Sequence, residues 1–280
     1  MDWLTEPFGF DIMQRALAAG LRAVVMTSTI GTWVVIRGMT FVGDALAHGV
    51  LPGIAVAVLI GVDPSIGAFV AAIVMVAIIS LVNRQSGLSE DTGIGLLFVG
   101  MLALGVVIIS RSDGFTGDLT SFLFGNPLGV TTGALRFPSA AMAVLLVAAA
   151  PLYRPLLVLS FNETKAALLG LRPGATHLVM MVLVGLSVVA SFRAVGTLMT
   201  FGLLVAPPAT AVLLVRRVWL VMVVAVLIGW VAVVTGLLVS YHHDTAAGAT
   251  MSLVAVAFFF VVLAGRELVE RLPRRTPAVA

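Results

Sequence analysis

The sequence GDALAHGVLPG at residues 43–53 places an acid and a histidine inside an otherwise apolar stretch. Asp44 and His48 are four residues apart, so on a helix they share one face. Asp44 is the only acidic residue within an expected membrane span, and His48 is the only histidine well inside one. An ionisable group at membrane depth costs roughly 2.5 kcal/mol or more, so it usually faces a pathway or a partner. A carboxylate paired with an imidazole also suits divalent transition metals.

Helix-disrupting residues flank this pair. Gly43 precedes it, and Pro52 and Gly53 follow it, so we expect the helix to break or loosen just beyond His48. Helices broken at mid-membrane are typical of transport sites. The alternative interpretation is that Asp44 caps a helix near the membrane surface and that His48 is a packing residue.

The rest of the chain is typical of a helical membrane protein. Of its 280 residues, 60% are hydrophobic and 10% are charged, and the mean hydropathy is +1.16. Apolar runs of about 18 or more residues recur along the chain. They predict an all-α polytopic membrane protein with a single transmembrane domain, residues 1–280. About nine spans (eight to ten) are expected, near residues 15–36, 41–62, 65–82, 93–110, 137–159, 177–192, 195–215, 218–241 and 247–264.

The distribution of charge predicts the orientation. A cytoplasmic C-terminus puts eleven of the 16 Lys and Arg residues on the cytoplasmic side, as the positive-inside rule requires. We therefore expect a multi-pass protein of the cell membrane with its C-terminus in the cytoplasm. Residues 1–14 are expected at the membrane interface, and residues 266–280 as a basic cytoplasmic tail. No nucleic-acid partner is implied, because the basic residues are spread over loops and helix ends.

Missing residue types exclude several chemistries. The chain has no cysteine, which excludes disulfides and thiolate metal sites. It has no phosphate-binding loop of the form Gly-x-x-x-x-Gly-Lys-Ser/Thr and no recognisable catalytic motif. We expect a protein that is not itself an enzyme and has no catalytic residues.

Two further segments are candidates for irregular helices. Pro207 and Pro208 remove two backbone donors from the seventh span, which is expected to kink or unwind there. This break either lines a pathway or is a structural kink. Residues 119–126 are too short to cross a bilayer and predict a re-entrant or interfacial helix.

Two polar segments are candidates for contacts with partners. Residues 160–176 form a polar excursion that predicts a short helix ending in glycine. This helix is either a docking element for a soluble cytoplasmic partner or an ordinary interfacial helix; its candidate docking residues are Glu163, Ala166, Leu169 and Gly170. At the outer end of the eighth span, His242, His243 and Asp244 either capture a metal or form a solvated loop.

Five ordered segments resemble the permease subunits of zinc and manganese ABC importers, the ABC-3 type. The residues 43–53 are similar to that family's GDALSHAVLPG, with Ala47 in place of serine and Gly49 in place of alanine. Pro208 also departs from the family, which has alanine at that position. The other similar segments are SEDTGIGLLFVGMLALGVVIIS (89–110), DLTSFLFGNPLGV (118–130), VGTLMTFGLLVAPPATAVLL (195–214) and DTAAGAT (244–250).

The resemblance implies a fold like that of type II ABC importer permeases and a homodimer with a translocation path at its axis. It implies cytoplasmic ATPase subunits, which bind ATP and dock on residues 160–174, and an extracytoplasmic solute-binding protein. Asp44 and His48 would then pass Zn²⁺ or Mn²⁺ as transported substrate, with no permanently bound cofactor. The alternatives are a permease for a metal chelate such as a siderophore or cobalamin, a proton-coupled secondary transporter acting alone, and a membrane protein without transport.

Overall fold

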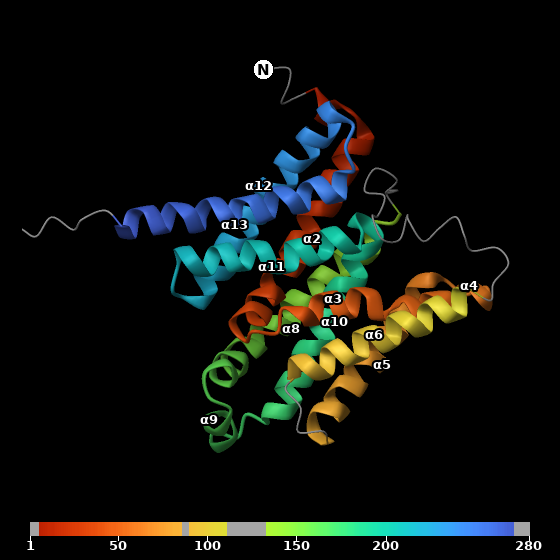
Figure 1. Cartoon of the computed structure of the whole chain (residues 1–280), viewed down its shortest axis with the longest axis vertical. Helices are drawn as coiled ribbons and strands as arrows, with labels where there is room; N and C mark the ends of the chain where they lie inside the picture. Colours follow the sequence, from red (N-terminus) through yellow and green to blue (C-terminus); the bar gives the residue numbers. More distant parts are fainter. Residues whose placement is uncertain (1–5, 86–89, 111–132, 272–280) are drawn as a thin grey trace, which may run out of the picture.

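The computed structural model describes residues 6–85, 90–110 and 133–271 of the chain. Within these ranges every regular element is helical (Figure 1). Eight helices there are long and apolar enough to cross a membrane, and a ninth has a shorter apolar part, Met199–Leu214. The prediction of about nine spans is therefore confirmed. The elements are η1 (Pro7–Gly9), α2 (Asp11–Ile36), α3 (Phe41–Gly49), α4 (Leu51–Leu59), α5 (Pro64–Gln85), α6 (Glu90–Ser110), α8 (Arg136–Phe161), α9 (Glu163–Leu168), α10 (Pro173–Val195), α11 (Thr197–Leu214), α12 (Val218–His243) and α13 (Ala247–Arg271).

The helices at the two ends extend beyond the expected spans. Helix α2 begins at Asp11, so residues 11–14 of the predicted interfacial segment are helical. Helix α13 continues to Arg271, so residues 266–271 of the predicted basic tail are helical too. Ion pairs one turn apart support this extension, with 2.8 Å between Arg266 Nε and Glu270 Oε1.

Helix α2 is the central helix of the bundle and packs against α8, α10, α11 and α12. Glycines allow two of these contacts to be close. A side chain at Gly20 would overlap Val233 of α12, and one at Gly31 would overlap the carbonyl oxygen of Leu204 in α11. Without a hydrophobic effect between helices in lipid, such close backbone approach supplies the packing energy.

Of the kink or unwinding expected in the seventh span at Pro207 and Pro208, the structure shows no unwinding. Helix α11 runs from Thr197 to Leu214 with both prolines inside it, and both are buried. Pro208 lacks the N–H that would bond to the carbonyl of Leu204, and that carbonyl lies against Gly31. The neighbouring helix covers the freed carbonyl, so the backbone has no need to unwind there.

The second span, in contrast, is broken as expected. Helix α3 ends at Gly49, helix α4 begins at Leu51, and Val50 joins them with φ −80° and ψ −13°. Pro52 occupies the first turn of α4, where a missing N–H is tolerated. Beyond the break, Gly53 and Gly67 pack backbone to backbone, with Ala57 and Ala71 one turn further along. This spacing of small residues holds α4 tightly against α5.

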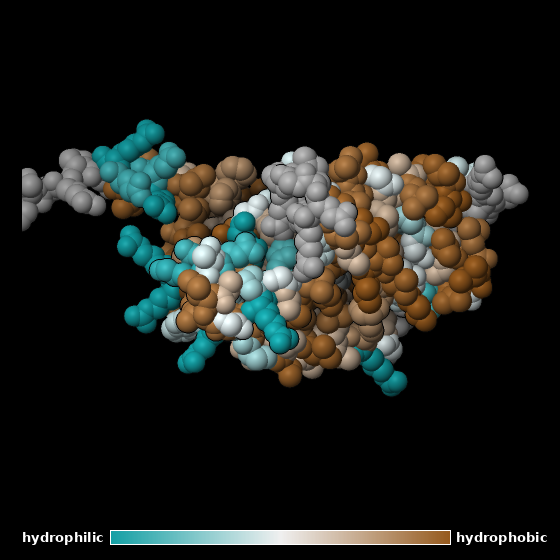
Figure 2. All heavy atoms as spheres, turned by 90° about the horizontal axis from the view of Figure 1, so that it is seen from below, coloured by the Kyte–Doolittle hydropathy of each residue, from teal (hydrophilic) through white to brown (hydrophobic). Residues whose placement is uncertain are grey.

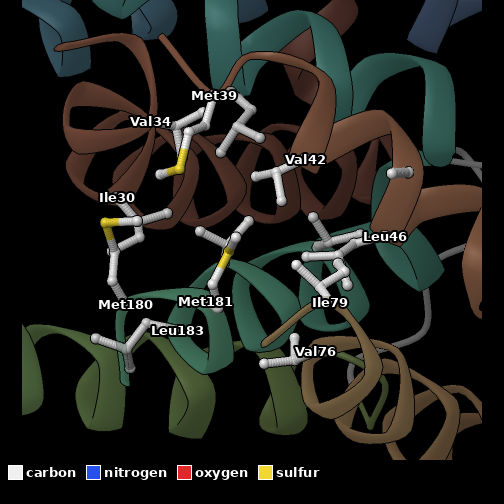
Figure 3. Packing of buried hydrophobic residues seen from close by; sticks show 14 of the residues in the cluster. Ile30, Val34, Met39, Val42, Leu46, Val76, Ile79, Met180, Met181 and Leu183 are labelled. Atoms are coloured by element: carbon white, nitrogen blue, oxygen red, sulfur yellow. The ribbon is translucent and has the colours of Figure 1, made fainter. Parts of the chain in front are cut away.

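The largest buried cluster joins α2, α3, α5 and α10 (Figure 3). From α3 it takes Val42 and Leu46, both fully buried and one helical turn apart. These two residues lie on the face of α3 opposite Asp44 and His48. The core therefore fixes the rotation of α3 and turns its ionisable face away from the packed interior.

Candidate functional site

Asp44 and His48 lie together on one face of α3. The distance between His48 Nε2 and Asp44 Oδ1 is 3.5 Å, and the side chains retain 23% and 30% exposure for His48 and Asp44, respectively. The N-cap position of α3 is Thr40, and Asp44 lies within the first turn of the helix. The two side chains are paired as predicted, and the pair remains partly accessible to solvent.

The separation of the two ligand atoms fits a shared metal ion. Two atoms that are each about 2.1 Å from one tetrahedral ion lie about 3.4 Å apart. The observed 3.5 Å between Nε2 and Oδ1 is close to this value. A divalent ion could therefore bind to both side chains with little change in their positions.

The other faces of α3 are occupied by neighbouring helices. Gly43 is buried, and a side chain there would overlap Leu204 of α11; at Gly49 it would overlap the sulfur of Met75 in α5. Gly43 thus serves close packing and is not part of a helix break. Gly49 also serves close packing. An alanine at this position, as in the family that the sequence resembles, would require Met75 to move.

The break beyond His48 changes the backbone of the site itself. Pro52 has no N–H to donate to the carbonyl of His48 four residues earlier, and the N–H of Val50 approaches this carbonyl instead. Helix bonding resumes with the N–H of Ile54, which donates to the carbonyl of Val50 at 3.1 Å. The carbonyl oxygen of His48 is therefore released from regular helix hydrogen bonding.

Two ligands do not complete a metal site. Divalent transition metals in proteins take four or more ligands. Among the described residues, no group of three or more His, Cys, Asp or Glu side chains is placed to hold one ion. The pair in one chain therefore leaves coordination positions open to water, to backbone oxygens or to a second molecule.

The predicted outer capture site is not formed. His242 and His243 end α12, and Asp244 follows in a left-handed conformation with φ 50°. The ring of His242 packs against Tyr241, with 5.2 Å between centroids. The three side chains do not converge as a group of metal ligands in the described part of the chain, because adjacent residues at a helix end point in different directions.

The predicted short helix in residues 160–176 is present as α9. The side chain of Asn162 caps it by accepting a hydrogen bond from the Lys165 N–H at 2.9 Å. Gly170 ends the turn with φ 72°, a conformation that favours glycine. Among the candidate docking residues, Glu163 and Leu169 are exposed, whereas Ala166 is fully buried and cannot contact a partner.

The sequence interpretation missed two kinds of residue. Phe161 and Leu168 are the most exposed apolar side chains around α9, at 75% and 82%; apolar residues within a polar excursion were the available signal. Phe98 of α6 packs on the ring of His48, with 5.8 Å between centroids and 65° between the planes. No spacing in the sequence points to this contact. The predicted re-entrant helix at 119–126 lies outside the described residues.

The chain is similar to known metal transport proteins over most of its length. The model of the ABC 3 transport family matches residues 9–266. The manganese transport system membrane protein MntC of Halalkalibacterium halodurans is 34% identical over 90% of this chain and 88% of its own length. The chelated iron transport system membrane protein YfeD of Yersinia pestis is 34% identical over 93% of this chain and 87% of its own length.

A solved structure shows the same fold. The structure of PsaBC from Streptococcus pneumoniae in complex with Fab contains a chain with a TM-score of 0.82 and 31% identity, covering 94% of both chains. The expected architecture of an ABC importer permease is thus confirmed. ATP hydrolysis in such systems belongs to a separate subunit, in accord with the missing phosphate-binding loop. This chain belongs to the ABC 3 transport family and is the multi-pass membrane permease subunit of a metal ABC importer.

Proposed function

We propose that this permease carries a divalent first-row transition metal ion, Mn²⁺ or Zn²⁺, past Asp44 and His48. The observation that supports this most directly is the 3.5 Å separation of Nε2 and Oδ1 on a partly exposed helix face. Carboxylate and imidazole ligands suit both ions, and the name of the bacterial relative MntC favours manganese. Two ligands with open coordination positions also suit an ion that must be released.

A chelate is the second candidate substrate. It is favoured by the relative YfeD, whose name refers to chelated iron. A chelate brings its own ligands to the metal, so Asp44 and His48 would not bind the ion directly. The bare ion explains the paired ligand atoms, and a chelate does not.

The assembly follows from the incomplete site. We propose a homodimer in which a second copy supplies another carboxylate and imidazole across the path, because the described part of one copy brings only two such side chains together. An extracytoplasmic solute-binding protein would deliver the metal to this path. The ion is the transported substrate, and ATP is bound by the partner subunits.

The proposed orientation places α9, the α11–α12 turn and the C-terminal end of α13 in the cytoplasm. Figure 2 shows hydrophilic side chains gathered on one side of the molecule, and hydrophobic side chains over much of the rest. In both views this side contains the C-terminal end of α13. Arg216 and Arg217 between α11 and α12, and Arg266 and Arg271 in α13, contribute positive charge to the proposed cytoplasmic side.

Metal uptake by cells that express the complete transporter tests the substrate and the site. We expect Asp44→Ala and His48→Ala to reach the membrane but to lose more than about 100-fold in uptake of the transported ion, since losing a ligand exceeds the effect of losing its supporting contacts. His243→Ala is the matched control, because this exposed histidine lies outside the pair. Offering Mn²⁺, Zn²⁺ and a ferric chelate separately identifies the substrate. Wild-type uptake by both variants would contradict the proposed site.

We propose that α9 docks the ATPase through its exposed apolar residues. Leu168→Asp should weaken association by about 2 kcal/mol, because a central apolar contact becomes a buried charge. Lys165→Ala is the control on the same helix. Co-purification of the ATPase subunit measures the effect; equal recovery with Leu168→Asp would remove α9 from the docking surface.

A further inference from the structure

Helix α6 meets the rest of the molecule through one narrow seam. Its inward residues follow helical spacing, with Ile94 fully buried and Leu97, Phe98 and Met101 partly buried against the main core. At Gly105 an added side chain would crowd Leu51 and Pro52, at 3.0 and 3.2 Å. The helix therefore contacts the broken span on both sides of its break.

Most of α6 outside this seam is exposed. Leu96 and Val99, which stand on either side of Leu97 and Phe98 in the sequence, are 66% and 61% exposed. The helix is thus held through one face, which packs on α3, α4 and α5, and Phe98 is the aromatic residue of that face. The inward side chains of α6 therefore each contact a particular residue of the neighbouring helices.

The neighbour of Phe98 is the imidazole of His48. The ring centroids are 5.8 Å apart and the planes are tilted by 65°, a geometry that aromatic pairs favour. The terminal torsion of a histidine is broad and is not fixed by the backbone. A ring packed against the imidazole restricts this torsion, and in the restricted position Nε2 lies 3.5 Å from Asp44 Oδ1.

We infer that Phe98 is a positioning residue for metal transfer, which holds His48 with Nε2 directed toward Asp44 and so sets the affinity of the pair. This inference rests on the proposed function of Asp44 and His48 as metal ligands. Phe98 offers no ligand atom and acts only through His48. Loss of a contact that orients a metal ligand commonly lowers metal affinity by about 10- to 100-fold.

Binding of Co²⁺ tests the inference, because the visible absorption of this ion reports its coordination geometry. The permease and ATPase complex is placed in lipid nanodiscs without the solute-binding protein, so that only sites in the complex are measured. We expect Phe98→Ala to raise the dissociation constant about tenfold and to change the absorption of bound Co²⁺. Phe98→Tyr keeps the ring and should restore both.

Two controls separate positioning from folding. Leu97→Ala removes a partly buried side chain of the same seam and should leave Co²⁺ binding unchanged. Phe98→Leu keeps apolar volume without a flat ring, so it should fold and still bind Co²⁺ more weakly than the wild type. Wild-type binding by Phe98→Ala and Phe98→Leu, or an equal loss with Leu97→Ala, would overturn the inference.

The ligand variants separate this inference from the function on which it rests. If Asp44→Ala and His48→Ala lose Co²⁺ binding and the Phe98 variants do not, only the positioning role fails. If neither ligand variant loses Co²⁺ binding, the proposed metal site and the positioning role both fail. Loss in the ligand variants together with a graded loss in the Phe98 variants supports both.

Discussion

The α3–α4 segment and helix α11 both contain proline within a membrane span, but only the first is interrupted. In α11, the carbonyl released by Pro208 belongs to Leu204 and lies against Gly31 of the central helix. In α3–α4, the carbonyl released by Pro52 belongs to His48, whose side chain is partly exposed. Proline therefore does not decide by itself whether a helix breaks. We expect the neighbour that covers the freed carbonyl to decide it.

Both regions are buried, but different helices cover them. The residues around Pro207 and Pro208 are buried among other helices, and α11 packs on α2, α12 and α13. Val50, Leu51 and Pro52 at the break are also buried, and α6, which is largely exposed itself, packs on both α3 and α4. A continuous proline helix and a broken one thus both lie within the bundle. Only the broken one carries the Asp44–His48 pair.

The largest effect on stability is expected at Gly31, which covers the carbonyl oxygen of Leu204 in α11. Gly31→Leu would drive a side chain into the carbonyl of Leu204, and backbone atoms cannot yield as side chains do. We expect a loss of stability of about 3 kcal/mol or more, measured as the yield and thermal midpoint of the purified protein. Gly100→Leu is the control, because nothing lies within 4 Å of the added atom. A normal yield of Gly31→Leu would show that the α2–α11 contact does not hold α11 together.

A smaller effect is expected at the break itself. Pro52→Ala restores the N–H that can bond to the carbonyl of His48, so α3 and α4 could join as one helix. We expect normal expression with about tenfold slower metal transport, the size typical of changes that disturb the orientation of ligands. Transport in proteoliposomes containing the complete importer measures this. Wild-type transport would mean that the break is not needed for function.

The smallest effect is expected at Pro208. Pro208→Ala restores a donor to a carbonyl that Gly31 already covers, so the backbone gains little. A change of about 1 kcal/mol or less in the free energy of unfolding is expected, with unchanged transport. Thermal unfolding and uptake can be measured beside Pro52→Ala. If Pro208→Ala slowed transport as much as Pro52→Ala, the two regions would not differ as described.

Much of the fold could be predicted because membrane helices are specified locally. Span number, the helix at residues 163–168 and the pairing of Asp44 with His48 follow from apolar length, capping residues and helical spacing. The unwinding considered at Pro207 and Pro208 is not found, since the carbonyl that Pro208 frees is covered by Gly31 of a helix far away in the sequence. The outer cluster at His242 failed because neighbours in sequence need not converge in space.

The sequence by itself determined that this chain crosses the membrane about nine times and that an acid and an imidazole share a helix face before a proline. Those properties depend on composition and on spacings of four residues, which the helix geometry converts directly into structure. Only the tertiary structure decided that one proline breaks its helix and another does not. It also placed Phe98 on His48 and buried Ala166. Each of these depends on which distant backbone or side chain fills the space beside a residue.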